Sequence, residues 1–315
     1  MTSERAPRVS VGLPVYNGEP YLQLAIDAVL SQTFEDLELI VYDNASDDNT
    51  EQICRAAARG DRRVRYRRHD RNLGASRNFN LTFRAARGEY FRWMSADDEI
   101  DPACLDLCVE QLDNDPSAVL CHTQVRVIDR HGADRGDFEY ALDHADHPQP
   151  SRRFRDALDR DRWCFEVFGL IRSDALRRTR LLDRYVGSDR VLRAELALLG
   201  RYRLVPEPLF RNRDHPDRSV RALPAHHLRG AWFDPALEGR RLFPHWRILS
   251  EYARAIARAP VGWSEKGRCD AALLRWLRRD SNWARLGADL VIGVAPGTWE
   301  LMARRRRSRE SWLES

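Results

Sequence analysis

Two adjacent carboxylates, Asp97 and Asp98, lie just beyond a short run of mostly aromatic and apolar residues at positions 90–94, after Ser95 and Ala96. Neighbouring carboxylates repel each other unless a cation or a solvated loop offsets their charge. A hard divalent ion held by one or two carboxylates and by ligand phosphates would offset it, as magnesium and manganese do beside nucleotides. The alternative is the start of a helix near Pro102, because acidic side chains favour the positive end of the helix dipole. Taken alone, the stretch supports both interpretations equally.

The elements before this acidic pair alternate between strands and helices. Residues 90–94 lie between Gly88 and the polar cluster, a pattern that predicts a buried strand. Three earlier strands are expected at residues 9–13, 37–42 and 64–67, each followed by a polar loop and a helical period. Such alternation predicts right-handed βαβ units and a parallel sheet. Ligands of such sheets bind at the carboxyl ends of the strands, where the acidic pair would lie.

The pattern is less regular after the acidic pair. We expect a helix to about Asn114, a strand at residues 118–128, and a mobile loop with short helical pieces at residues 133–162. In a transferase, such a loop would be the place for a lid over the acceptor. Further strands are expected at residues 164–171, and as two short edge strands at residues 202–205 and 209–213 on either side of Pro206-Glu207-Pro208.

Only helical periods follow the last predicted strand. We therefore expect a sheet domain at residues 1–222 and a helical C-terminal extension at residues 223–315. The extension carries apolar residues at helical spacing over residues 242–259 and 271–290, and it ends in a basic block at residues 304–309. Such a block is usually a solvated tail, but it also suits an anionic membrane surface.

Charge and composition do not point to a nucleic-acid-binding protein. The chain has 52 Lys and Arg against 48 Asp and Glu, and no basic stripe with interleaved aromatic residues. Six cysteines without CxxC spacing are expected to be buried, reduced thiols. Because no apolar run has the length of a membrane span or the form of a signal peptide, we expect a cytoplasmic protein, or one peripheral at the cytosolic face of a membrane.

Five stretches can be weighed together because of their order. They are Pro14-Val15-Tyr16-Asn17 after the first strand, Asp43 after the second, Asp97-Asp98 after the fourth, Gly187-Ser188-Asp189 at a helix start, and residues 211–216. Over residues 8–220 this ordered set resembles the family 2 glycosyltransferases of the GT-A fold. The resemblance implies an α/β, Rossmann-like, mainly parallel sheet flanked by helices. It also implies inverting transfer of a sugar from a nucleotide-diphosphate donor to a hydroxyl of a saccharide, glycolipid or natural-product acceptor.

The resemblance implies a donor site formed by Pro14, Tyr16, Asp43, Arg77 and Asp97. Tyr16 could stack on the base, and Asp43 would accept a hydrogen bond from an imide, which favours UDP or dTDP and leaves GDP as an option. The alternative for Asp43 is to cap its own loop or the following helix. The alternative for Arg77 is a solvated arginine on a helix surface.

The resemblance also implies a divalent metal, manganese or magnesium, at Asp97, Asp98 and His215. The family's acidic motif commonly has Asp where this chain has Ser95, but both following carboxylates remain, so we expect metal binding to be retained. Which of the two touches the ion is open. His215 is an expected contact to the metal or the diphosphate, or alternatively a structural histidine beside Pro216.

Asp189 is the general base that the resemblance implies, because inverting transfer needs a group that accepts the proton of the attacking hydroxyl. Its alternative role is to cap the helix that it begins. A second hypothesis is a catalytically silent nucleotide-sugar-binding or assembly module, motivated by Ser95 and by the helical extension. A nucleotide-dependent oxidoreductase is weakly supported, since no GxGxxG follows the first strand.

Overall fold

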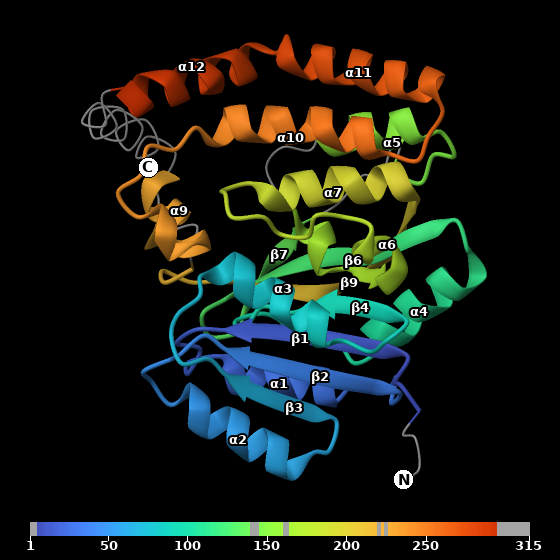
Figure 1. Ribbon diagram of the computed structural model, residues 1–315. Helices are drawn as coiled ribbons and strands as arrows, with labels where there is room; N and C mark the ends of the chain where they lie inside the picture. The colour runs from blue at the N-terminus through green and yellow to red at the C-terminus, as the bar shows by residue number, and fades with distance from the viewer. Residues whose placement is uncertain (1–4, 139–144, 160–163, 219–221, 224–225, 295–315) are drawn as a thin grey trace.

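A computed structural model describes residues 5–138, 145–159, 164–218, 222–223 and 226–294 of the chain (Figure 1). Nine strands form one sheet in the order β3-β2-β1-β4-β8-β6-β9-β5, with β7 paired to β6. Helices pack on this sheet, and further helices build layers beyond it at one end of the molecule (Figure 1).

The first four strands are parallel and match the prediction. They are β1 (Val9–Val15), β2 (Leu37–Asp43), β3 (Val64–Arg68) and β4 (Tyr90–Trp93), joined by α1 (Leu22–Leu30), α2 (Thr50–Gly60) and α3 (Ala75–Ala85). Every residue of β1 and β2 is buried, as expected for strands covered on both faces. The carboxyl ends of these strands therefore meet at one edge of the sheet.

The sheet is mixed beyond β4. Its elements are β5 (Glu99–Ile100), α4 (Cys104–Asn114), β6 (Ala118–Asp129), β7 (Asp134–Phe138), α5 (Pro150–Asp159), η1 (Phe165–Phe168), β8 (Leu170–Arg172), α6 (Ser173–Arg177), α7 (Ser188–Leu199) and β9 (Arg201–Asp214). Strand β8 runs antiparallel to β4 and β6, whereas β9 runs parallel to β6 and antiparallel to β5. The prediction of a strand at residues 164–171 was wrong in its first half, which forms the 3-10 helix η1.

The prediction of two short edge strands at residues 202–205 and 209–213 was also wrong. They form one strand, β9, which lies between β6 and β5. Pairing with β6 passes from Val205 directly to Phe210 through a bulge, and Pro206 and Pro208 lie in that bulge. A proline there leaves no ladder hydrogen bond unmade, so the two prolines do not break the strand.

The prediction of a mobile loop at residues 133–162 was wrong for its described parts, which contain β7 and α5. Helix α5 packs against α7 and α11 and buries Phe154 completely. The misleading residue is Arg153, a charged residue that is itself buried and donates to the carbonyl oxygens of His147, Pro148 and Ala197. Residues 139–144 and 160–163 of the expected loop lie outside the described residues.

The C-terminal part consists of α9 (His226–Phe233), η2 (Pro235–Leu237), α10 (Pro244–Arg258), α11 (Trp263–Leu277) and α12 (Asp280–Val294). Tyr252 of α10 and Trp276 of α11 belong to the same hydrophobic cluster as Phe91 and Trp93 of β4. The sheet and the extension thus share a core, and the boundary between residues 222 and 223 stays a prediction. The basic block at residues 304–309 lies outside the described residues.

Two further expectations concern the cysteines and the absence of a membrane span. All six cysteines are free, and five of them are buried. Among the residues that the structure describes, no helix has the length and apolarity that crossing a membrane requires.

The shared core predicts that damage to the extension destabilises the whole chain. Trp276 is 4% exposed and its ring meets that of Tyr252 edge to face, so Trp276→Ala should cost about 3–5 kcal/mol. Thermal unfolding followed by circular dichroism should show one transition at a lower Tm. Trp263→Ala is the matched control because Trp263 is 89% exposed, and it should change stability by less than about 0.5 kcal/mol. Two separate transitions in the Trp276 variant would contradict a common core.

Candidate functional site

Three of the five predicted donor residues, Pro14, Tyr16 and Asp43, lie at the carboxyl ends of β1 and β2. Pro14 is buried inside the sheet and pairs with Tyr42, whereas Tyr16 directly after β1 is 49% exposed. Asp43 ends β2 and is completely buried. Tyr16 is therefore the aromatic surface that this edge of the sheet offers to a ligand, with Asp43 in the framework behind it.

Hydrogen bonds between side chains and backbone join the loops after β1 and β2. The backbone N–H of Asn17 donates to Ser46 Oγ at 2.9 Å, and that of Gly18 donates to Thr50 Oγ1 at 2.9 Å. In return, Asn17 Oδ1 accepts from the N–H of Asp47 at 3.1 Å. Asn17 has φ of 52°, a left-handed conformation that Asn tolerates better than most residues. The two loops therefore form one unit.

The carboxylate of Asp43 is held on both oxygens. Oδ1 accepts from the N–H of Ser46 at 2.8 Å, and Oδ2 accepts from the Tyr66 hydroxyl at 2.9 Å and lies 3.3 Å from Arg68 Nε. The loop-capping alternative for Asp43 is thus present in this structure. Sequence reasoning missed Tyr66 and Arg68, because three of the five residues of β3 are arginines and arginine is abundant throughout the chain.

The acidic pair splits into two environments. Asp98 is 2% exposed, and its Oδ1 accepts from Asn212 Nδ2 and from the N–H of Arg213, both at 2.9 Å. Burial, reinforced by the neighbouring charge of Asp97, raises the pKa of Asp98 to about 7. Asp98 therefore ties the acidic loop to the end of β9.

The Asp97 side chain is 29% exposed and meets His215, whose Nε2 lies 3.0 Å from Asp97 Oδ2. His215 is buried, its ring centroid is 4.9 Å from that of Tyr21, and among the described residues its Nδ1 has no hydrogen-bond partner. No group of three or more His, Cys, Asp or Glu in the described part of the chain is arranged to hold a metal. One carboxylate and one imidazole nevertheless fit a hard ion that completes its shell with water and ligand phosphates.

Arg213 connects the acidic loop after β4 to the ends of β6 and β9, a region that we call the acidic corner. Sequence reasoning missed this role. Its guanidinium donates to the carbonyl oxygens of Asp97 at 3.0 Å and Asp129 at 3.1 Å, and it pairs with Glu99. It also lies 4.8 Å from the ring centroid of Tyr21 in the connection between β1 and α1. The stretch at residues 211–216 matched the family motif as a whole, but nothing in it distinguished Arg213 from Arg211.

Arg77 and Asp189 stand apart from these contacts. Arg77 is exposed on α3, while the next residue, Asn78, is buried and donates to the carbonyl of Tyr42 at 2.9 Å. Asp189 is half-buried in the first turn of α7, after Gly187 with φ of 89°, and the helix has no side-chain cap. Within the described residues, no hydrogen bond or ion pair joins either side chain to the other predicted site residues.

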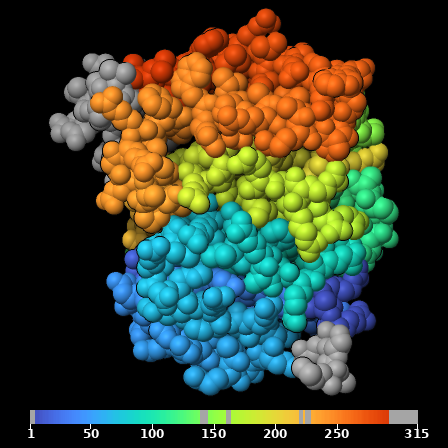
Figure 2. Space-filling model, in the orientation of Figure 1, coloured from blue at the N-terminus to red at the C-terminus, as the bar shows by residue number. Residues whose placement is uncertain are grey.

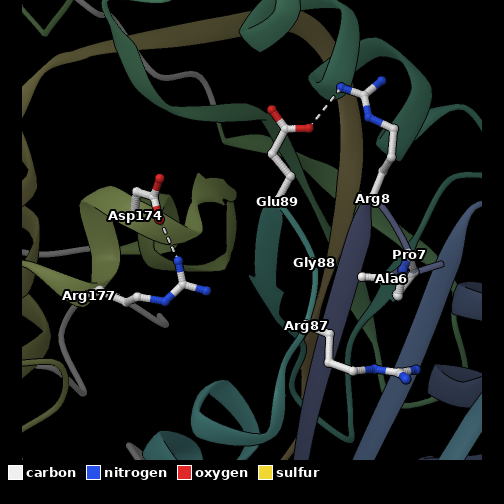
Figure 3. Close-up of a pocket in the computed structure, with 8 residues that line it drawn as sticks. All are labelled: Ala6, Pro7, Arg8, Arg87, Gly88, Glu89, Asp174 and Arg177. Atoms are coloured by element: carbon white, nitrogen blue, oxygen red, sulfur yellow. Dashed lines mark hydrogen bonds and ion pairs between the residues drawn. The ribbon is translucent and has the colours of Figure 1, made fainter. Parts of the chain in front are cut away.

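An open pocket elsewhere on the molecule does not coincide with this chemistry. A cavity of about 360 Å³ lies at the amino ends of β1 and β4, the opposite edge of the sheet (Figure 3). Its arginines already have carboxylate partners, Arg8 with Glu89 and Arg177 with Asp174 as Figure 3 shows, and Arg87 with Glu38. The candidate site is therefore the open carboxyl edge of the sheet.

Comparison with known sequences identifies a family. A sequence model described as Glycosyl transferase family 2 matches residues 10–186, more than half of the chain. Chondroitin synthase of Escherichia coli is 33% identical over 131 residues, which are 42% of this chain and 19% of that protein. The matched segment spans less than two fifths of the length of each of the first curated relatives.

Solved structures share the fold at low identity. TarS of S. aureus, residues 1–349 in complex with UDP, superposes with a TM-score of 0.61 at 15% identity over 87% of this chain and 72% of that one. Mannosyltransferase PcManGT of Pyrobaculum calidifontis, in complex with GDP-Man and Mn2+, gives 0.51 at 19% identity over 94% and 88%. With the mainly parallel sheet and its flanking helices, these likenesses confirm the predicted GT-A type α/β fold with C-terminal helices.

The buried Asp98 predicts a pH dependence of stability in metal-free protein. The folded state keeps the Asp98 proton up to about pH 7, whereas the unfolded chain releases it near about pH 4. Because the folded state then binds more protons in this window, the free energy of unfolding should fall as the pH rises from about 4 to about 7. Asp98→Asn should lessen this fall by up to about 1.4 kcal/mol per pH unit, measured by urea unfolding in chelator. Asp47→Asn, at an exposed loop position, is the control, and identical slopes in all three proteins would contradict the assignment.

Proposed function

The chain belongs to glycosyl transferase family 2, and from this membership we propose that it is an inverting glycosyltransferase. It moves a sugar from a nucleotide-diphosphate donor to a hydroxyl of a saccharide, glycolipid or natural-product acceptor. One observation carries the proposal: the partly exposed carboxylate of Asp97 meets His215 beside the connection that follows β1. That arrangement offers ligands for an ion and its diphosphate at the edge of the sheet where α/β proteins bind nucleotides.

Donor recognition is assigned to the loops after β1 and β2. Tyr16 offers an exposed ring for stacking on the base, and Pro14 fixes the strand end from which Tyr16 projects. Asp43 is an acceptor with Arg68 beside it as a donor, a pair that matches the imide N–H and carbonyl of uracil or thymine. UDP or dTDP is therefore the favoured donor nucleotide, and GDP remains an option, with Arg77 at the rim. The solved neighbours contain UDP and GDP-Man, which supports a nucleotide-sugar donor without selecting the base.

Asp97 and His215 are the residues that would hold a divalent manganese or magnesium ion. When bound, such an ion stabilises the negative charge that develops on the leaving nucleoside diphosphate. We assign Asp98 a positioning role because its Oδ1 already accepts two hydrogen bonds from β9. Because Ser95 replaces the family's common Asp, Asp97 and His215 are the two direct protein ligands in this proposal. Two protein ligands suit an ion that also binds the donor phosphates.

Asp189 is assigned as the general base. A hydroxyl that attacks the anomeric carbon opposite the leaving group must lose its proton, and a carboxylate within reach accelerates this by about 10²- to 10⁴-fold. Asp189 suits the role because it is half-buried and, among the described residues, its carboxylate has no hydrogen-bond or ion-pair partner. In this proposal the domain at residues 1–222 holds the donor, and the extension at residues 223–315 contributes to the acceptor side or to localisation.

Calorimetric titration of the purified protein with UDP, dTDP and GDP, each with and without manganese, tests the proposal. We expect binding of at least one nucleotide, strengthened by manganese. No binding of any nucleotide by protein that circular dichroism shows to be folded would contradict it.

The metal assignment predicts a loss of nucleotide affinity that appears only when the ion is present. Asp97→Asn and His215→Ala should each weaken nucleotide binding in manganese by about tenfold or more, because each removes a ligand of the ion. Without manganese, both variants should bind nucleotide as the wild type does. Asp47→Asn, in the neighbouring loop, should behave as wild type in both conditions. An equal loss of affinity with and without the ion would contradict the assignment, because it would mean that the two residues contact the nucleotide directly.

The base assignment predicts a separation of binding from turnover. Asp189→Asn should lower the rate of sugar transfer by about 10²- to 10⁴-fold and leave the Kd for the donor unchanged. Initial rates with a productive donor and acceptor pair, combined with calorimetry, provide both quantities. Asp174→Asn, whose carboxylate is 93% exposed at the start of α6, is the control. Loss of donor binding along with activity would mean that Asp189 has another role.

A further inference from the structure

The last two described helices expose large apolar side chains to an unusual degree. The exposed fractions are 89% for Trp263 and 54% for Leu274 on α11, and 52% for Trp283, 49% for Leu290 and 46% for Val291 on α12. These side chains are not disordered loop residues, because each lies on a helix that packs on α10 through another side. We call the surface formed by these five residues the outer face.

Helical spacing places the outer face on one side of each helix. On α11, Trp263, Gly267 and Leu274 repeat at intervals of four and seven residues, and on α12, Trp283, Gly287, Leu290 and Val291 repeat at intervals of four, three and one. The buried Trp276 lies on the opposite side of α11, and the buried Asn282, Leu286 and Asp289 form an adjoining side of α12. Over residues 282–291 of α12, the exposed positions are all apolar or glycine. A helix side of this kind normally packs against something.

The outer face is accessible to a large flat partner. In Figure 1, α11 and α12 form the layer farthest from β1, β2 and β3, with α10 beneath them. In Figure 2 the same two helices make up the top of the molecule. Both pack their inner sides on α10, so a planar partner can reach both helices at once.

Charges around the outer face favour an anionic partner. Arg275 and Arg278 are exposed beside Leu274, and neither forms an ion pair within the described part of the chain. Lys266 lies over the Trp263 ring at 5.4 Å. The exposed acidic residues on α11 and α12 are Asp270 and Asp280. They are outnumbered by the exposed arginines on and between these helices, which are Arg268, Arg275, Arg278 and Arg279. After α12 the sequence continues for 21 residues that include the basic block at residues 304–309.

Tryptophan beside arginine on an exposed apolar helix side is the composition of interfacial helices, in which the rings enter the headgroup region and the cations meet lipid phosphates. We propose that the outer face docks the protein on an anionic bilayer surface. This inference stands on α11 and α12 alone and does not depend on the proposed function.

Flotation of the full chain with vesicles tests the proposal. We expect binding to phosphatidylcholine vesicles that contain phosphatidylglycerol, and much weaker binding to phosphatidylcholine alone. The double variant Trp263→Ser/Trp283→Ser should weaken binding about tenfold or more, because it removes the inserted rings. The double variant Arg275→Gln/Arg278→Gln should weaken it about fivefold for each arginine.

Matched controls come from the other end of the molecule. Leu24→Ser removes a leucine that is 47% exposed on α1, and Arg62→Gln removes an exposed arginine, so both variants should bind vesicles as the wild type does. A chain truncated after residue 294 separates the outer face from the basic block and should keep most of the binding.

Three results would overturn the proposal. One is wild-type binding in both double variants with loss in the truncated chain, which would place the contact in the last 21 residues. Another is the absence of vesicle binding together with a dimer in analytical ultracentrifugation that the tryptophan variant abolishes, which would make the outer face an interface between copies of the chain. The third is equal binding to neutral and anionic vesicles.

Discussion

The structure of the site depends on one buried carboxylate, that of Asp98. By accepting hydrogen bonds from Asn212 and from the backbone of Arg213, it fixes the acidic loop after β4 to the far end of β9. These segments are more than a hundred residues apart in the chain, and their junction brings Asp97 to His215. Burying a carboxylate disfavours its charged form, so this junction has a desolvation cost. In return, it fixes the position of Asp97 beside His215. Binding a cation beside Asp97 would relieve that cost, which links occupation of the site to the stability of the fold.

The donor side is rigid for a different reason. Its loops are joined through short polar side chains such as Asn17, Ser46 and Thr50, which accept hydrogen bonds from backbone N–H groups of the neighbouring loop. Each side chain has few rotatable bonds, so little entropy is lost when the loops are held together. The contact of Tyr21 with His215 and Arg213 extends this framework to the acidic corner. A ligand bound across β1, β2 and β4 therefore meets groups that are already in place.

The elements that could be predicted from the sequence are those whose signals are local. The βαβ units up to residue 94 follow from apolar periods and turn residues. The ordered motifs singled out Asp97 and His215, whose side chains meet in the structure. Pairing between distant segments was not predictable: the bulge that lets β9 continue past Pro206 depends on its alignment with β6. A buried charge caused the wrong prediction of a loop for a related reason. An arginine such as Arg153 normally indicates a solvent-exposed position, and its burial depends on the surrounding carbonyl oxygens, which the sequence does not reveal. The same applies to Asp43, whose partners Tyr66 and Arg68 come from the neighbouring strand.

The central claim is that Asp97 and His215 together hold a metal ion for the donor diphosphate, while Asp98 holds the loop. An anomalous difference map at the manganese edge, from crystals grown with manganese and the nucleoside diphosphate that binds best, tests this most directly. The account predicts one manganese peak in direct contact with an Asp97 carboxylate oxygen, with His215 Nε2 and with the diphosphate, and no contact with Asp98. A bound nucleotide whose manganese is held by Asp98, or by neither Asp97 nor His215, would contradict it.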